Sequence, residues 1–363
     1  MPITETIWKI EPHTQVKHAI LERYLQAWLP ILSRWNGRIL YIDGFAGPGK
    51  YLDDNNKPTI DGSPLIAINT AIRHKLPLAK VLFLFIEKEA DRYEYLVNLL
   101  KSIDLPQNME YKAKLGKFDE HVSYILDVLD EQKKSLAPAF VFIDPFGYMD
   151  TPFSLVKRIM EINKCEVLIT FTYRSLIQWG ISKPDQHEHV NELFGTDKWK
   201  KALEISNPSE KKEFLIRLYQ KQLENFANIA YVRFFEMINK SNQAEYFLFF
   251  GTNKIDGLRA MIRSMYKVDQ EGEFKFSDRT NPNQAVLFSP TPNYSLLKKL
   301  LNKKFKSKTV PIEEVEEFAL ITGFVKFKRE VLRLMEYSDP PQIKAFNRKI
   351  KGTYPPGTTI KFS

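Results

Sequence analysis

The sequence predicts an α/β fold: a doubly wound, mostly parallel sheet that ends in an antiparallel hairpin, followed by a smaller C-terminal domain. Short apolar runs alternate with amphipathic segments as far as residue 174, as in strands buried between two layers of helices. Two aromatic-rich runs, 228–238 and 244–253, then flank a polar turn, which is typical of a hairpin. A final Lys- and Arg-rich pattern of three helices and a hairpin predicts the second domain.

The elements follow in order along the chain. Residues 15–35 predict an amphipathic helix, with Tyr24, Leu25 and Trp28 on one face. Five strands are expected after it, each an apolar run bounded by polar or turn-forming residues. They are 39–42, 80–87, a shorter strand within MEYKAKLGKFDE (109–120), 138–144 and 165–173. A helical insertion is expected at about 180–227, ahead of the hairpin, and a further helix at 255–266.

These patterns divide the chain into three parts. Residues 1–270 predict the α/β domain, and residues 271–293, which are polar and contain several prolines, predict a linker. Residues 294–363 predict a winged-helix domain. Its expected helices are 295–305, 312–320 and 325–337, followed by a two-stranded wing.

Composition excludes several classes of protein. With 44% hydrophobic and 13% aromatic residues, the chain is expected to be ordered and globular. No apolar run approaches the ~18 residues that span a bilayer, and the N-terminus lacks a signal-peptide pattern. Cys165 is the single cysteine, which excludes an internal disulfide and a thiolate metal cluster. We therefore expect a cytoplasmic protein with no membrane contact and no metal site.

The net charge of +9 is concentrated near the C-terminus. Residues 291–363 hold 15 Lys and Arg against 7 Asp and Glu, whereas residues 1–290 hold 38 against 37. Basic surfaces attract polyanions such as nucleic-acid backbones. The alternative is a solvated, lysine-rich surface without a partner.

The segment DGFAGPGKY, residues 43–51, fits two motifs. From Gly44 it resembles the phosphate-binding loop G-x-x-x-x-G-K, which needs a hydroxyl residue after the lysine to ligate magnesium. Tyr51 stands at that position, and its phenol is too far from the backbone to substitute. From Asp43 it fits D-x-F-x-G-x-G, the first strand and turn of an S-adenosylmethionine (SAM) methyltransferase. We favour this second interpretation.

In this interpretation Asp43 receives the ammonium of SAM, Phe45 lies in the turn, and Gly47 and Gly49 let the backbone approach the cofactor. Glu87 ends the second strand, where a carboxylate can accept both ribose hydroxyls. The alternative for Glu87 is an incidental surface glutamate.

Phe118 and Asp119 follow the third strand and are candidates for contact with the adenine. Asp119 is equally suited to cap the helix that starts there.

The sharpest signal is DPFG, Asp144 to Gly147, at the end of the fourth strand. Asp144 and the Pro145 carbonyl can accept hydrogen bonds from an exocyclic base amine, and Phe146 can stack on the base. Such acceptors orient a poorly nucleophilic amine rather than remove its proton. The base must be unpaired or flipped from its stack. The alternative is a structural turn that uses Pro145 and Gly147.

Further contacts with the substrate are predicted from position and charge. His13 and Lys17 begin the first helix, near the pocket mouth, where they would meet the SAM carboxylate or a substrate phosphate. Tyr173 and Arg174 follow the fifth strand, where such folds complete a substrate site. Nucleic-acid contacts are expected from the third helix and the wing of the C-terminal domain. They are Lys326, Lys328, Arg329, Arg348 and Lys349.

The chain resembles the three-Cys-motif partner protein family (TcmP) over nearly its full length. The shared segments are His13-Thr14 with Lys17, YLQAW, DGFAGPGKY, GSPL, FIEKE and IDPFGY. The resemblance implies a class I SAM-methyltransferase (Rossmann-like) fold and association with a separate radical-SAM-like protein that carries the three cysteines. FIDPFG is also similar to the motif of tRNA guanine-N2 dimethyltransferases, whereas Phe146 and Gly147 depart from the Pro-Pro-aromatic pattern of adenine-N6 enzymes.

We therefore expect a SAM-dependent methyltransferase that acts on nucleic acid, DNA or RNA, at an exocyclic base amine. The alternative is a non-catalytic adaptor that binds SAM or nucleic acid for its three-Cys-motif partner. An open pocket beside Asp144 favours the enzyme, and a pocket filled by side chains favours the adaptor.

Overall fold

The computed structural model describes residues 5–269, 271–278 and 292–363, so residues 279–291 of the expected linker lie outside it. Contacts divide the chain into two compact units. The main unit is Met1–Gly257 with Lys275–Pro282, and the C-terminal unit is Leu258–Phe274 with Asn283–Ser363. No helix in the described part of the chain combines the length and the apolar composition that a membrane span requires.

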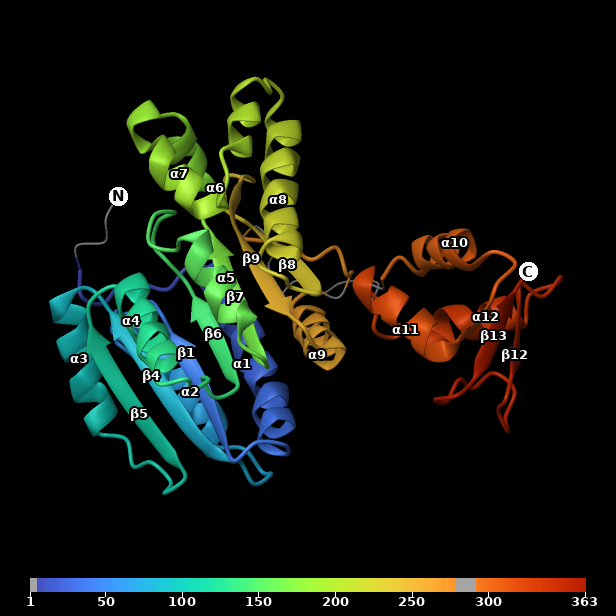
Figure 1. The fold of residues 1–363 in the computed structure, drawn as a ribbon, viewed down its shortest axis with the longest axis horizontal. Coiled ribbons are helices and arrows are strands. Elements are labelled where there is room, and N and C mark those ends of the chain that lie inside the picture. The colour runs from blue at the N-terminus through green and yellow to red at the C-terminus, as the bar shows by residue number, and fades with distance from the viewer. Residues whose placement is uncertain (1–4, 270, 279–291) are drawn as a thin grey trace. The chain divides into compact units, whose positions relative to one another are not determined.

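The main unit contains an eight-stranded sheet with the order β10-β8-β9-β7-β6-β1-β4-β5 (Figure 1). Its strands are β1 Arg38–Asp43, β4 Lys80–Glu87, β5 Met109–Leu115, β6 Ala139–Ile143, β7 Cys165–Phe171, β8 Tyr231–Ile238, β9 Ala244–Thr252 and β10 Lys275–Ser277. The strands from β5 to β7 along the sheet are parallel. Strand β9 runs antiparallel to both β7 and β8.

This strand order is that of a class I methyltransferase. The five parallel strands lie in the order third, second, first, fourth and fifth along the chain, and an antiparallel hairpin closes the sheet. The predicted class I, Rossmann-like fold is confirmed. Strand β10 is an addition: residues of the expected linker pair parallel with β8.

Helices cover both faces of the sheet. They are α1 Pro12–Ser33, α2 Ser63–Ile72, α3 Ala90–Lys101, α4 Phe118–Glu131, α5 Phe153–Glu161 and α8 Pro208–Asn225, whereas most of α9 Ile255–Met265 belongs to the C-terminal unit. One face packs against α4, α5 and α8 in a continuous apolar core. On the other, Tyr24 and Trp28 of α1 contact Phe140 of β6, with ring centroids 4.9 and 5.9 Å apart. Because both faces are covered, the inner strands are predominantly apolar.

A helical insertion between β7 and β8 begins earlier than the expected residue 180. Its elements are α6 Tyr173–Ser175, the π-helix η1 Leu176–Ile181, the 3₁₀ helix η2 Pro184–Gln186, α7 His187–Phe194, the 3₁₀ helix η3 Lys198–Leu203 and α8. Val190, Phe194 and Trp199 are buried in the same core as β7.

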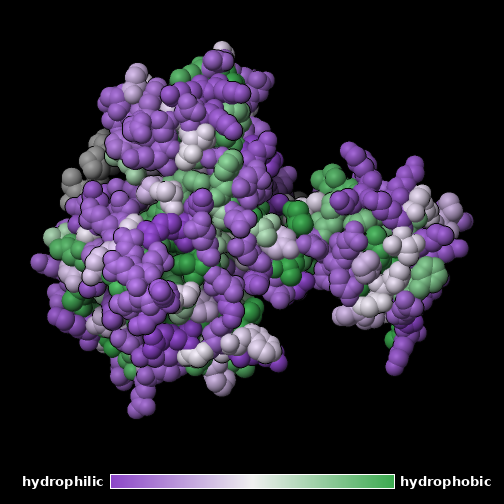
Figure 2. All heavy atoms as spheres, viewed as in Figure 1, coloured by the Kyte–Doolittle hydropathy of each residue, from purple (hydrophilic) through white to green (hydrophobic). Residues whose placement is uncertain are grey.

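The surface drawn in Figure 2 is mostly hydrophilic, with scattered hydrophobic side chains, as is normal for a folded surface.

The C-terminal unit contains helices and a three-stranded antiparallel sheet of order β11-β13-β12. Its elements after residue 292 are α10 Tyr294–Phe305, β11 Thr309–Pro311, α11 Ile312–Ile321, the π-helix η4 Lys328–Arg333, α12 Leu334–Glu336, β12 Ile343–Phe346 and β13 Thr359–Phe362. Leu297, Val315, Val331 and Ile360 lie in one shared core.

The helix expected at 325–337 begins only at Lys328. Helix α11 ends in a Schellman motif, in which Gly323 has a φ of +99° and the Phe324 N–H donates to the Ala319 carbonyl at 2.7 Å. The chain leaves helical geometry there, and the buried side chains of Phe324 and Phe327 enter the core.

Candidate functional site

The glycine turn after β1 is joined to the end of β4. Gly47 and Gly49 have φ values of +60° and +81°, in the left-handed region that favours glycine. A Cβ on Gly49 would also come within 2.9 Å of the Leu96 side chain. The Gly47 N–H donates to Glu87 Oε2 at 2.7 Å. Two motifs that are separate in the sequence therefore form one structure.

The turn does not continue as a phosphate-binding loop. Such a loop would open a helix at Lys50. Instead Lys50–Tyr51 forms β2, which pairs antiparallel with β3, Ile60–Asp61. Lys50 Nζ donates to Asp61 Oδ1 at 2.6 Å. The ammonium group that would bind a phosphate is therefore already paired with a carboxylate. The structure thus agrees with the choice against the phosphate-binding interpretation.

Asp43 lies at the end of β1 and is fully buried. Its carboxyl accepts hydrogen bonds from the Phe45 N–H, at 3.3 Å, and from the Ser63 side chain. Burial raises the pKa of Asp43 to about 7, although these two hydrogen bonds oppose the rise. The carboxyl therefore stabilises the turn through the Phe45 N–H. Asp43 lines neither of the two cavities described next.

Glu87 ends β4 and is 4% exposed. Besides Gly47, its carboxylate accepts a hydrogen bond from the Glu89 N–H, at 2.8 Å to Oε1. Burial raises the pKa of Glu87, and these backbone hydrogen bonds oppose the rise. A carboxylate has about four acceptor positions, so both oxygens can still accept from a ribose hydroxyl.

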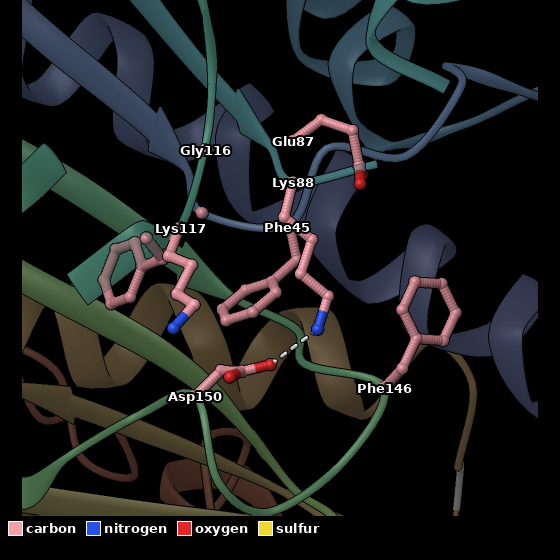
Figure 3. A pocket seen from close by; sticks show the side chains of 9 residues that line it. Phe45, Glu87, Lys88, Gly116, Lys117, Phe146 and Asp150 are labelled. Carbon is pink, nitrogen blue, oxygen red and sulfur yellow. Dashed lines mark hydrogen bonds and ion pairs between the residues drawn. The ribbon is translucent and has the colours of Figure 1, made fainter. Parts of the chain in front are cut away.

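Glu87 lines a narrow pocket at the ends of β4 and β5 (Figure 3). The open volume is only about 10 Å³. Figure 3 shows why: the Phe45 ring lies in the middle of the pocket, and beside it Lys88 reaches across to Asp150. Their Nζ and Oδ2 atoms are 2.9 Å apart. Side chains therefore close the place where the sequence predicts adenine.

The two residues predicted to meet adenine differ in position. Phe118 lines the narrow pocket and lies so close to Gly44 that a Cβ there would be 2.4 Å from its ring. Asp119 does not line it. Its Oδ1 atom is buried and, among the described residues, has no hydrogen-bond partner. The helix-capping alternative for Asp119 also finds no support, because α4 begins at Phe118 and the cap residue is Lys117.

A wider cavity of about 200 Å³ lies beside Gly47. Asp144, Pro145 and Phe146 of the DPFG segment line it. Phe146 is 53% exposed, and its ring meets that of Trp8 edge-on at 5.5 Å. The residues predicted to hold a base amine and the turn predicted to hold a cofactor thus share one cavity.

Asp144 forms an ion pair inside this cavity that the sequence did not indicate. Lys17 Nζ of α1 lies 2.7 Å from Asp144 Oδ1 and 2.5 Å from Oδ2. The Lys17 side chain is only 7% exposed, and its ammonium also lies 5.1 Å from the centre of the Tyr246 ring. A substrate amine that binds Asp144 must share or displace this ammonium.

His13 also lines the cavity and joins three segments of the main unit. Its Nδ1 lies 2.9 Å from Asp278 Oδ2, just beyond β10, and its Nε2 lies 2.9 Å from Glu11 Oε2. Tyr246 donates to the His13 carbonyl at 3.1 Å. Burial lowers the pKa of His13, but the hydrogen bonds to Glu11 and Asp278 outweigh it, and the net pKa is raised.

Thr170, near the end of β7, and Thr172, just after it, line the same cavity. Neither is among the residues predicted from the sequence. The Oγ1 atoms of Thr170 and Thr172 are buried and have no hydrogen-bond partner within the described residues. Thr170 is only 4% exposed. Polar residues in the otherwise apolar run CEVLITFTY are the signal that could have found them. Both hydroxyls can donate to or accept from a bound molecule.

Other predicted residues lie outside both cavities. Gly49 and Gly147 line neither of them. The Tyr173 ring packs against Phe247 at 5.9 Å. Arg174 pairs with Glu245 at 3.0 Å, and Glu245 itself lines the wide cavity.

The basic residues of the C-terminal unit divide into exposed and paired ones. Lys326, Arg329 and Lys349 are exposed. Lys328 pairs with Glu316 at 3.2 Å. Arg348 is almost fully buried, because its guanidinium pairs with Glu336, and it therefore stabilises this unit rather than facing a ligand.

The site fits SAM in part. Gly47 and the open volume beside it suit the amino-acid end of the cofactor, and the Glu87 carboxylate suits the ribose. The adenine end fits only after Phe45 and the Lys88–Asp150 ion pair move, because the pocket there has about 10 Å³ of open space.

No protein-family model and no curated protein sequence matches the chain. Among solved structures, protein LPL1258 from Legionella pneumophila is similar, with 15% identity and a TM-score of 0.38, over 67% of this chain and 85% of that chain. Cofactor-bound Rv0187 from MTB has 11% identity and a TM-score of 0.35, over 70% and 84%. Trm1 from Pyrococcus horikoshii with S-adenosyl-L-methionine has 11% identity and a TM-score of 0.35, over 89% and 78%. These values assign no function to this chain, and membership of the TcmP family stays a prediction.

Proposed function

We propose that the protein is a SAM-dependent methyltransferase that acts on nucleic acid at an exocyclic base amine. One observation carries the proposal: the carboxylate of Asp144 and the residue Pro145 line a cavity of about 200 Å³ that Gly47 of the glycine turn also lines. In such an arrangement an amine acceptor and a cofactor-binding turn face the same space.

Each residue has a distinct task in this proposal. The turn at Gly47 and the carboxylate of Glu87 hold SAM, which supplies an electrophilic methyl group when bound. Asp144 and the Pro145 carbonyl accept the N–H groups of the base amine and orient its nitrogen. Phe146, half exposed at the cavity, stacks on the base.

Lys17 limits which molecules can reach Asp144. The ammonium already donates to both oxygens of the carboxylate. A neutral base amine is a weaker donor than an ammonium, so it gains Asp144 only where other contacts of the base contribute. Thr170 and Thr172, whose hydroxyls lack partners within the described residues, can supply such contacts from β7 and the residue after it.

The C-terminal unit is proposed to deliver the nucleic acid as a winged-helix domain. The succession of α10, β11, α11, η4 with α12, and the β12–β13 hairpin supports this assignment. Lys326, Arg329 and Lys349 are its exposed cations among those predicted to contact nucleic acid. Association with a radical-SAM-like three-Cys-motif protein rests on the family resemblance alone.

A second function is supported by the narrow pocket. With about 10 Å³ open between Phe45, Phe118 and Lys88, the adenine site is closed as it would be in a non-catalytic adaptor. An adaptor that binds no SAM differs from the enzyme in SAM binding, and an adaptor that binds SAM differs from it in methyl transfer.

The first test is therefore SAM binding by calorimetry on the wild type, Glu87→Gln and the matched control Glu89→Gln, whose side chain is exposed. We expect saturable binding that Glu87→Gln weakens by about tenfold or more, as for loss of a hydrogen bond to a charged group. The control should bind like the wild type. No binding at millimolar SAM would reject the enzyme and favour the adaptor.

If SAM binds, labelled methyl transfer to RNA and DNA tests the role of Asp144. Asp144→Asn should lower kcat by about a hundredfold, as for removal of one oriented electrostatic interaction, with the dissociation constant of SAM unchanged. Unchanged transfer by this variant would reject Asp144 as the group that orients the amine.

A further inference from the structure

The C-terminal unit contains a cavity that no predicted motif explains. Its volume is about 630 Å³, and the end of α9, the start of α10 and the segment before η4 line it. Three cations, Arg263, Lys267 and Lys326, and two aromatic residues, Tyr266 and Tyr294, account for most of its lining. No carboxylate among the described residues lines the cavity.

The three cations are available to an anion. All three side chains are exposed. By contrast, Arg259 and Lys328 of this unit share the carboxylate of Glu316, at 3.4 and 3.2 Å. Within the described residues, Arg263, Lys267 and Lys326 form no such ion pair. Uncompensated positive charge around a concavity attracts phosphate groups.

The two tyrosines are held in place rather than free. The Tyr266 hydroxyl donates to the Gly323 carbonyl at 2.9 Å, and its ring meets Phe274 edge-on at 5.6 Å. The Tyr294 ring lies 6.1 Å from that of Phe324. Both are only partly buried, so part of each side chain remains accessible. A fixed, accessible aromatic ring is a surface on which an unpaired base can stack.

We propose that this cavity binds single-stranded nucleic acid, with phosphates at Arg263, Lys267 and Lys326 and a base against Tyr294 or Tyr266. Cations and aromatic rings in one concavity suit a single strand, which exposes its base faces, whereas a duplex buries them. This choice of ligand rests on the proposed function, in which the substrate is a nucleic acid. The inference adds that the nucleic acid is single-stranded and that these residues bind it. Of these residues, only Lys326 is among those predicted from the sequence.

The test measures binding of fluorescein-labelled poly-uridine RNA and poly-thymidine DNA to the full-length protein by anisotropy. Arg263→Glu/Lys267→Glu is compared with Lys299→Glu/Lys303→Glu, which reverses two exposed lysines of α10 outside the cavity. We expect the first pair to weaken binding at least tenfold and the second less than threefold. The slope of log affinity against log salt should fall by about 0.7 for each phosphate that the variant no longer neutralises. An equal weakening by both pairs would reject the site.

Stacking is tested separately with Tyr294→Ala and Tyr294→Phe. Tyr294→Ala should weaken single-strand binding about fivefold or more, the range for loss of one stacked base. Tyr294→Phe keeps the ring and should bind like the wild type. A duplex of equal length that binds as tightly as the single strand, or an alanine variant that binds like the wild type, would overturn the single-strand assignment. Because no SAM is present, these outcomes are independent of whether the main unit is a methyltransferase.

Discussion

At the scale of residues, the site depends on carboxyl groups buried at the ends of neighbouring strands. Asp43 and Glu87 both have raised pKa values because burial disfavours their charged forms. For Asp43 the pKa in the folded protein is about 7, against an ordinary value of 3.8. Folding therefore favours the protonated carboxyl. The stabilisation that this protonation provides is complete below about pH 4 and is lost as the pH rises to about 7.

Asp43→Asn should remove this pH dependence, because the amide keeps an oxygen for the Phe45 N–H and cannot ionise. Between pH 5 and pH 7 the free energy of unfolding of the wild type should fall more steeply than that of the variant, by at most about 1.4 kcal/mol per pH unit. Urea unfolding followed by tryptophan fluorescence measures this in the main unit, since all five tryptophans precede residue 258.

The matched control for this experiment is Asp53→Asn. Asp53 is partly exposed, and hydrogen bonds from the Lys57 backbone and the Thr59 side chain lower its pKa. Its substitution should leave the steep decline in place. A decline of the same slope in Asp43→Asn and the wild type would show that Asp43 is ionised in the folded protein at neutral pH.

At the scale of elements, a buried carboxyl on β7 joins a helix to two strands. Glu166 Oε2 accepts from the Tyr24 hydroxyl of α1, and Oε1 accepts from the Thr252 hydroxyl of β9, both at 2.5 Å. Tyr24→Phe should lower the free energy of unfolding by about 1–3 kcal/mol, because it leaves a buried acceptor with one partner fewer. The same urea experiment measures it.

Tyr219→Phe provides the comparison for Tyr24→Phe. Tyr219 is also fully buried, but its hydroxyl has no hydrogen-bond partner within the described residues. Its loss should change the free energy of unfolding by less than about 0.5 kcal/mol. Equal effects of the two substitutions would mean that packing of the rings, and not the bond to Glu166, stabilises the contact of α1 with the sheet.

The same scale explains what the sequence could and could not predict. Continuous apolar runs predicted the parallel strands, and acidic residues at their ends placed Asp43, Glu87 and Asp144 at one edge of the sheet. The three residues of β10 lie in a polar segment, and only their pairing with β8 makes them a strand. Lys17 and Asp144 are 127 residues apart, and His13 and Asp278 are 265 apart. Local periodicity carries no information about such contacts.

At the scale of the whole molecule, charge and cavities are distributed unequally along the chain. Residues 291–363 hold 15 Lys and Arg against 7 Asp and Glu, and the remainder is nearly neutral. The cavity with Asp144 belongs to the main unit, and the cavity with Arg263 and Lys267 belongs to the C-terminal unit. Binding of the polynucleotide and orientation of the base are therefore expected to respond to different substitutions.

Arg263→Glu/Lys267→Glu should raise KM for the polynucleotide substrate at least tenfold. The values of kcat and of the dissociation constant of SAM should stay within about twofold of the wild type. The reason is that these cations contribute to binding equally before and during methyl transfer. Raising the salt concentration should increase KM of the wild type more steeply than that of the variant, because fewer phosphate contacts remain to be screened. Lys299→Glu/Lys303→Glu controls for net charge. A fall in kcat at unchanged KM would instead place Arg263 and Lys267 in the orientation of the reacting base, and the division of tasks between the two units would be wrong.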